Sequence, residues 1–143
     1  MSALDDAIRT GASMPEEVDV LASRNGTGQD AAISILVWRH TDDQYQTDQV
    51  STAVEISISG LADGEHVLRH HRIDADHSNA HTVWQALGSP QVPTDSQLAQ
   101  IKERQGLEEL EPPRAVTVTD GALELTVELP LPAVSLLTLE RAR

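Results

Sequence analysis

The sequence predicts a mainly β fold: an antiparallel β-sandwich with a small two-helix insertion. Residues 50–59 and 122–129 alternate apolar and polar side chains, which is typical of strands with one buried and one exposed face. Residues 80–106, between strand-like segments, instead show helical spacing and helix-capping residues. Several short strands interrupted once by helices favour two packed sheets.

Seven segments have the composition of strands: residues 18–23, 31–39, 50–59, 65–73, 114–119, 122–129 and 134–139. The second is apolar on both faces, which predicts a strand buried on two sides with Trp38 in the core. Turns are expected at residues 25–28 and 60–64. Asp120-Gly121 is the turn dipeptide of a two-residue type I′ hairpin, so it should join the two strands beside it.

Two helices are predicted inside the insertion. The first carries one apolar stripe, formed by Ala80, Val83, Trp84 and Leu87. Asp76 or Ser78 is available as its N-cap and Gly88 as its end, and Trp84 is expected to be a core anchor rather than a sugar platform. The second helix begins at Thr94 with a capping-box pattern and continues to about Gly106.

The 143 residues predict a single domain, large enough to bury a core without disulfides. Residues 1–16 contain turn-forming and acidic residues that interrupt a regular helix or strand pattern, so we expect a lead-in or linker there. Residues 17–143 would form the β-sandwich domain, with the helical insert at about residues 77–106.

The composition excludes several classes of function. There is no cysteine, so neither a disulfide nor thiolate chemistry is possible. The net charge of −13 repels phosphate and anionic lipid, so we expect neither nucleic acid nor membrane as a partner. No apolar run approaches the length of about 18 residues of a membrane span, and no signal peptide is visible at Met1, so we expect a soluble, cytoplasmic protein.

The stretch from residue 70 to residue 84 is the first candidate for a functional surface, because polar and histidine residues are dense where strand gives way to helix. Polar side chains packed at such a junction need hydrogen-bond partners. We therefore predict that its members face an interface or a ligand, with four candidates: His71, Asp74, His77 and Asn79.

Other interpretations of this stretch remain open. His77 and His81 are four residues apart and could share a helix face, but the metalloprotease pattern that would make this spacing specific is missing. Asp74, Asp76 and the acidic run at residues 108–111 are acid–base candidates by residue type only. The simpler alternative is that these polar groups join the sandwich to its insert by hydrogen bonds and that Arg72 and Asp74 form a local ion pair. We expect no catalytic residue, no cofactor and no metal on this chain.

Several runs resemble glycoside hydrolase family 39, which contains β-xylosidases and α-L-iduronidases. The most specific are His71-Arg72-Ile73-Asp74, His77-Ser78-Asn79-Ala80 and Gly88-Ser89-Pro90-Gln91. Further similar segments, in the same order as in the family, are residues 18–24, 35–38, 42–43, 82–84, 93–94, 107–114 and 134–139. The similarity covers about residues 18–140, with departures at residues 39–41 and at His81, where the family favours aromatic side chains.

In that family this region is the C-terminal β-sandwich, and the two catalytic glutamates lie in a preceding (β/α)8 barrel. Such a barrel takes about 250 residues, more than this chain has. The resemblance therefore implies a non-catalytic accessory domain of a retaining β-xylosidase-like enzyme. It also implies the catalytic barrel as partner and allows contacts between copies in a homo-oligomer.

Two rival classes remain. A carbohydrate-binding module would bind xylo-oligosaccharides by itself, although the chain has only two tryptophans and one tyrosine to stack on sugars. A metal-dependent enzyme would retain zinc and lose stability with a chelator.

Overall fold

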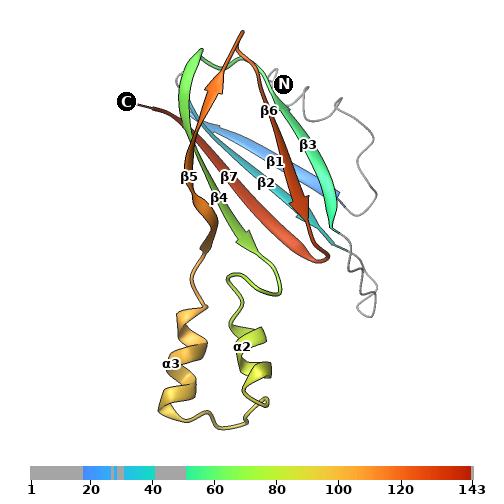
Figure 1. The fold of residues 1–143 in the computed structure, drawn as a ribbon, viewed down its shortest axis with the longest axis vertical. Coiled ribbons are helices and arrows are strands. Elements are labelled where there is room, and N and C mark those ends of the chain that lie inside the picture. Colours follow the sequence, from blue (N-terminus) through green and yellow to red (C-terminus); the bar gives the residue numbers. More distant parts are fainter. Residues whose placement is uncertain (1–17, 27, 29–30, 41–50, 143) are drawn as a thin grey trace.

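The structure is a computed structural model that describes residues 18–26, 28, 31–40 and 51–142. Seven strands in this part form two antiparallel sheets: β1 (Val18–Asn25), β2 (Ala32–Arg39), β3 (Thr52–Ile58), β4 (Gly64–Ile73), β5 (Glu108–Val118), β6 (Leu123–Leu129) and β7 (Ala133–Arg141). The larger sheet has the order β1-β2-β7-β4-β5, and β3 pairs with β6 in the smaller one. The predicted mainly β fold with antiparallel sheets is confirmed (Figure 1).

Both sheets contribute to one apolar core. Alternate residues of each strand are buried, as in β2, where Ile33, Ile35 and Val37 are at most 4% exposed. The smaller sheet contributes its own alternate residues, among them Ile58 and Leu129. This period of two is what places one face of each strand in the core.

The prediction that β2 is buried on both sides is wrong. The smaller sheet covers only one face of the larger sheet, so the even-numbered residues of β2 lie on the outer face. Trp38 is therefore only partly buried and is not part of the core. Periodicity could not reveal this, because Leu36 and Trp38 make the outer side of the strand as apolar as the inner one.

The strand β5 begins at Glu108, six residues before the predicted start at Arg114. Its register with β4 shifts on both sides of His70, which accommodates the irregular stretch that contains Pro112 and Pro113. Proline is tolerated here because β5 is an edge strand and one of its sides needs no ladder partner.

The Asp120-Gly121 turn forms as predicted, but the hairpin does not continue. Both residues have positive φ, 54° and 71°, as a type I′ turn requires, and Thr119 pairs with Ala122. Beyond that bridge the chain separates, because β5 belongs to the larger sheet and β6 to the smaller one. The turn thus carries the chain from one sheet to the other.

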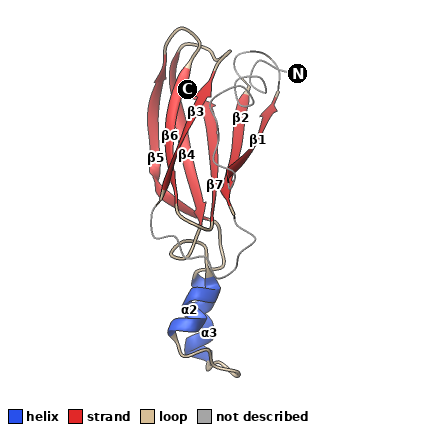
Figure 2. Cartoon of the chain, turned by 90° about the vertical axis from the view of Figure 1, so that its right-hand side faces the viewer, coloured by secondary structure: helices blue, strands red, loops and turns tan. Residues whose placement is uncertain are grey.

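Two helices, α2 (Ala80–Ala86) and α3 (Asp95–Glu103), pack against each other beyond one end of the sandwich. We call residues 80–106 the helical arm (Figures 1 and 2). Neither helix has a buried residue. They have seven and nine residues, and no helix in the part of the chain that the structure describes is long and apolar enough to cross a membrane.

The ends of the helices follow the sequence in part. Thr94 forms the predicted capping box with Gln97, and Gly88, at φ 89°, ends α2 with the paired hydrogen bonds of a Schellman motif. The N-cap of α2, however, is Asn79 and neither Asp76 nor Ser78. The predicted lead-in at residues 1–16 lies outside the described residues.

Candidate functional site

The candidate residues lie at the joint between the sandwich and the helical arm, where β4 ends. Asp74, whose side chain is only 8% exposed, is the centre of this joint. One carboxylate oxygen accepts hydrogen bonds from the backbone of Asp76 and from Nδ1 of His77, each at 2.8 Å. The other lies 3.3 Å from Nη1 of Arg72, which confirms the predicted ion pair.

The next two residues continue the joint. The Ser78 hydroxyl donates to the carbonyl of Arg72 and accepts from the backbone N–H of Glu108, so it links β4 to the start of β5. The Asn79 amide donates to the carbonyl of Asp74, and its oxygen caps α2 by accepting from Thr82. Because both polar ends of Asn79 are used, the side chain fixes the direction in which the arm leaves the sandwich.

Beneath this joint, Arg72 crosses from one sheet to the other. The residue is 4% exposed, and its guanidinium donates to the Ser135 hydroxyl on β7 and to the carbonyl of Glu128 on β6. Ser135 also shares a 2.8 Å hydrogen bond with Nε2 of His70. Burial, and next the charge of Arg72, lower the pKa of His70 to about 4, so the imidazole is neutral near neutral pH.

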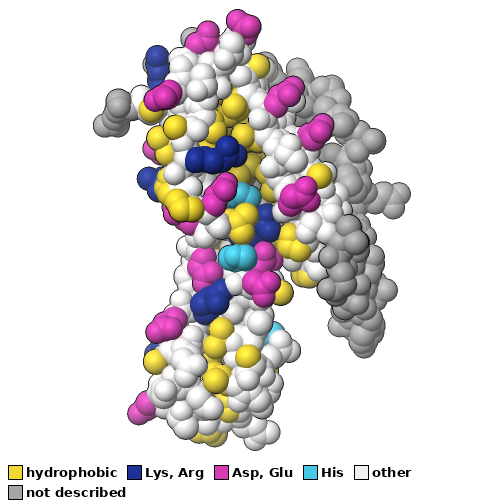
Figure 3. All heavy atoms as spheres, in the orientation of Figure 1, with side chains coloured by type: hydrophobic (Ala, Val, Ile, Leu, Met, Phe, Trp, Pro, Cys, Tyr) yellow, Lys and Arg dark blue, Asp and Glu magenta, His cyan; other side chains and the backbone are white. Residues whose placement is uncertain are grey.

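Within the arm, Trp84 contacts its own helix and the loop that follows it, and it is not part of the sandwich core. Its indole N–H donates to the carbonyl of Pro90 at 3.0 Å, and its ring stacks on His81 at a centroid distance of 5.4 Å. Arg104, after α3, connects the arm to the joint: its guanidinium donates hydrogen bonds to both carboxylate oxygens of Glu108 and to the carbonyl of Asp76. The space-filling view shows basic, acidic and histidine side chains gathered where sandwich and arm meet (Figure 3).

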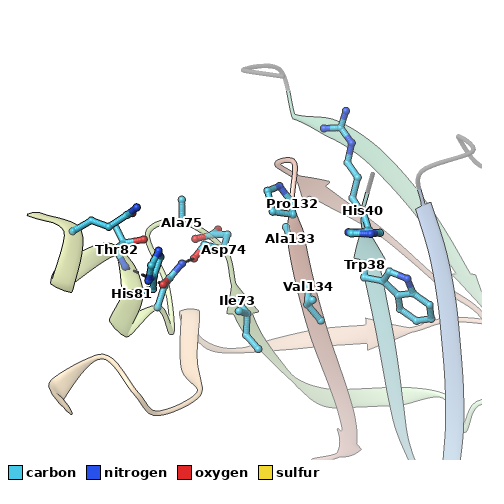
Figure 4. Close-up of a pocket in the computed structure, with 13 residues that line it drawn as sticks. Trp38, His40, Ile73, Asp74, Ala75, His81, Thr82, Pro132, Ala133 and Val134 are labelled. Carbon is cyan, nitrogen blue, oxygen red and sulfur yellow. Dashed lines mark hydrogen bonds between the residues drawn. The ribbon is translucent and has the colours of Figure 1, made fainter. Parts of the chain in front are cut away.

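A hollow of about 500 Å³ lies beside the joint, between α2 and the outer face of the larger sheet. Its apolar wall includes Trp38, Val134 and Ile73, which sit in register on three neighbouring strands. Across the hollow, α2 contributes His81 and Thr82 (Figure 4). Sequence reasoning missed this feature, because its wall combines residues far apart in the chain.

The four predicted residues do not form one group. Asp74, His77 and Asn79 come together at the joint, as described above. His71 lies on the opposite face of β4 from Arg72, opposite Leu136, with Nε2 3.8 Å from Glu109. Its Nδ1 atom is buried and has no hydrogen-bond partner among the described residues. The prediction that these residues face an interface or ligand stays a prediction.

The joint is a poor place for proton transfer. Burial opposes ionisation of Asp74, but the hydrogen bonds from His77, Asp76 and Arg72 outweigh it and hold the pKa of the carboxyl below its usual range. The side-chain hydrogen bonds from Arg104 likewise lower the pKa of Glu108. A general acid needs the opposite shift, so both carboxylates are placed to accept hydrogen bonds rather than to give up a proton.

Metal binding has no support in the described ranges. Among residues 18–26, 28, 31–40 and 51–142, no group of three or more histidine, aspartate or glutamate side chains is placed to hold an ion. The two histidines whose spacing suggested a metal site have different partners: His77 forms a hydrogen bond with Asp74, and His81 stacks on Trp84.

Comparisons with known proteins point to one family. The profile of glycosyl hydrolases family 39 matches residues 5–122. The solved structure of the bacterial orthologue of human α-L-iduronidase is 25% identical, with a TM-score of 0.71, over 87% of this chain and 22% of that one. A monomeric β-xylosidase from Caulobacter crescentus CB15 is 21% identical, with a TM-score of 0.66, over 87% of this chain and 26% of that one.

A third structure, the family 39 enzyme from Xanthomonas axonopodis pv. citri, is 19% identical with a TM-score of 0.67, over 85% of this chain and 26% of that one. The chain thus spans about a quarter of the length of the solved structures it matches. No curated protein matches it in sequence.

Proposed function

The chain belongs to family 39 of the glycosyl hydrolases, and from this premise we propose that it is a non-catalytic accessory domain. In this proposal its β-sandwich supports the catalytic (β/α)8 barrel of an enzyme resembling xylan 1,4-β-xylosidase. The enzyme would hydrolyse β-xylosides with retention, using two carboxylates of the barrel as nucleophile and acid/base. We place the enzyme in the cytoplasm, because the absence of cysteine suits a reducing compartment.

The proposal depends mainly on one observation: the run from Arg72 to Asn79, the most specific family motif, holds parts of the fold together. The polar side chains of the run from Arg72 to Asn79 are bonded mainly to one another, to the helical arm or to the opposite sheet. Residues that hold two parts of a fold together in this way are not free to bind and release a substrate. The motif therefore supports a domain whose task is shape and stability.

A second candidate, a xylo-oligosaccharide-binding module, is favoured only by the hollow. Its volume of about 500 Å³ and the indole of Trp38 would suit a small sugar. At its rim, however, the carboxylate of Asp74 and the amide of Asn79 already have partners. Because sugar recognition depends on unsatisfied polar groups, we rank this candidate below the accessory domain.

The test is a proton–nitrogen correlation NMR titration of the labelled chain with xylobiose, with the sugar's anomeric signals followed in the same tube. We expect dispersed peaks, no shifts and intact sugar. Saturable shifts of Trp38 and α2 would replace the proposal by the binding module. Loss of xylobiose would show that the chain is itself an enzyme.

A further inference from the structure

The strand β1 ends at Asn25, and Gly26 follows it, so a side-chain amide stands next to the backbone nitrogen of a glycine. Asn25 is exposed and forms the last pair of the β1–β2 ladder, opposite Ala32. β1 is an edge strand of the larger sheet, and among the described residues only β2 pairs with it (Figure 2). Exposed ladder ends with one neighbour open most readily, so the backbone at Asn25 has more freedom than a core strand.

Gly26 leaves its own backbone nitrogen accessible. The residue is exposed, has φ 102°, and a Cβ atom placed on it would meet nothing closer than 3.8 Å, at Ala31. A larger residue would shield the nitrogen and stiffen the backbone, whereas glycine does neither. The nitrogen of Gly26 can therefore approach Cγ of Asn25 when the end of the ladder opens.

We propose that Asn25 is a site of spontaneous deamidation. The backbone nitrogen of Gly26 loses its proton and attacks Cγ of Asn25; the Cγ–Nδ2 bond breaks, ammonia leaves with that proton, and a succinimide ring is closed. Water then opens the ring at either carbonyl and leaves an aspartyl or an isoaspartyl residue at position 25. The reaction consumes water and releases ammonia, and it does not depend on the proposed function.

The other asparagine of the chain, Asn79, is protected from the same reaction. Its amide nitrogen donates to the carbonyl of Asp74, and its oxygen accepts from Thr82. The residue after it, Ala80, carries a methyl group and begins α2, so the nitrogen that would attack is shielded and its backbone is held in the helix. Both hydrogen bonds of Asn79 must break before a ring can close.

The two aspartates that precede a glycine, Asp63 and Asp120, are also poorly placed. An ionised carboxylate repels an attacking anionic nitrogen, which a neutral amide does not. The nitrogen of Gly121, which would attack Asp120, instead donates a 2.7 Å hydrogen bond to Oδ1 of Asp63. Gly64, which follows Asp63, already belongs to β4 and pairs with Val118. The pair at the end of β1 is therefore the one placed to react.

Deamidation changes both the charge and the backbone at this end of β1. Either product adds a negative charge to a chain whose net charge is −13. The isoaspartyl product also inserts a methylene group into the main chain, so position 25 loses its register with Ala32, because each strand residue spans a fixed rise. The modified fraction grows with time, so older molecules are more acidic and have a shorter β1–β2 ladder.

The experiment incubates the purified full chain at physiological temperature and mildly alkaline pH. Anion-exchange chromatography follows the acidic species, and peptide mapping by mass spectrometry locates the mass gain, with an unincubated sample digested in parallel. We expect Asn25 to react faster than Asn79 by roughly tenfold or more, since the hydrogen bonds of Asn79 must break first. Asn25→Gln keeps a neutral amide but needs a larger ring, so it should remove most of the acidic species.

A second variant separates the charge from the backbone change. Asn25→Asp carries the added charge without the extra methylene group. We expect the acidic fraction isolated from wild type to lose hydrogen-exchange protection at the Asn25–Ala32 end of the ladder, and Asn25→Asp to keep it. Equal protection in the two would overturn the shortened ladder.

Three outcomes would overturn the site itself. If position 25 gains mass in urea but not in the folded chain, the end of β1 protects Asn25. If Asn25 and Asn79 react at equal rates, their different surroundings do not select the site. If acidic species form as fast in Asn25→Gln as in wild type, the added charge comes from another position.

Discussion

The sandwich and the helical arm are stabilised in different ways. The sandwich buries aliphatic side chains from all seven strands, with Val37 and Leu129 fully excluded from solvent. The arm buries no residue in either helix and depends on caps, the Trp84–Pro90 hydrogen bond and the contacts of Arg104. Short helices without such contacts are marginal in water, so the arm takes its order from local polar bonds and from the joint.

This difference explains the position of the motifs that resemble the family. The strands need only alternating apolar residues, and many sequences satisfy that need. The joint and the arm need particular groups: an amide at Asn79, a hydroxyl at Ser78 and a residue at position 88 that accepts φ 89°. A dense, specific motif can therefore mark a demanding piece of structure as well as an active site.

The largest expected effect comes from removing the group that connects the two sheets to the joint. Arg72→Met should destabilise the chain by about 3 to 5 kcal/mol, because it leaves the buried carboxylate of Asp74 with one fewer partner and removes the hydrogen bonds to Ser135 and to the carbonyl of Glu128. Urea unfolding measures the effect. Arg69→Met is the control, since Arg69 lies on the outer face of the same strand, has a side chain that is 50% exposed and pairs with the exposed Glu109, so it should cost less than about 1 kcal/mol. Equal losses would mean that the joint adds nothing to the sandwich.

A smaller effect should follow from pH. The unfolded state binds a proton at His70 below about pH 6.5, whereas the folded state binds it only near a pKa of about 4, so stability falls as the pH falls through this window. The loss reaches at most about 3 kcal/mol. Unfolding free energies of wild type and His70→Gln, measured from about pH 7 to about pH 4.5, should differ in slope, with the variant less pH-dependent. Parallel curves would contradict the neutral, buried His70.

The smallest effect should be local to the arm. Asn79→Ala removes the cap of α2 and should cost about 1 kcal/mol, seen as hydrogen exchange of the α2 amides that is faster by roughly fivefold. The strand amides should keep their protection. Thr94→Ala is the matched control, because it removes the cap of α3 instead. If Asn79→Ala speeds exchange in the strands equally, arm and sandwich open as one unit and the contrast between them is lost.

Local patterns predicted much of the molecule. Alternation at residues 50–59 identified β3, and the capping box at Thr94 and the glycine at position 88 marked a helix start and a helix end. These features depend on residues within one or two turns of each other, so a single sequence contains the information. The N-cap of α2 was missed because three neighbouring polar residues could each have filled that role.

The sequence by itself determined that the chain forms antiparallel strands with a helical insertion, that Arg72 and Asp74 pair, and that the segment from residue 70 to residue 84 joins strand to helix. Only the tertiary structure decided which face of β2 is covered, that Arg72 reaches across to Glu128, and that Trp38, Val134 and Ile73 meet beside α2. The physical reason is the distance along the chain over which the interactions act. Periodicity and capping act between neighbours in the chain, whereas burial of a sheet face depends on which distant element packs against that face, and the smaller sheet covers only one side of the larger one.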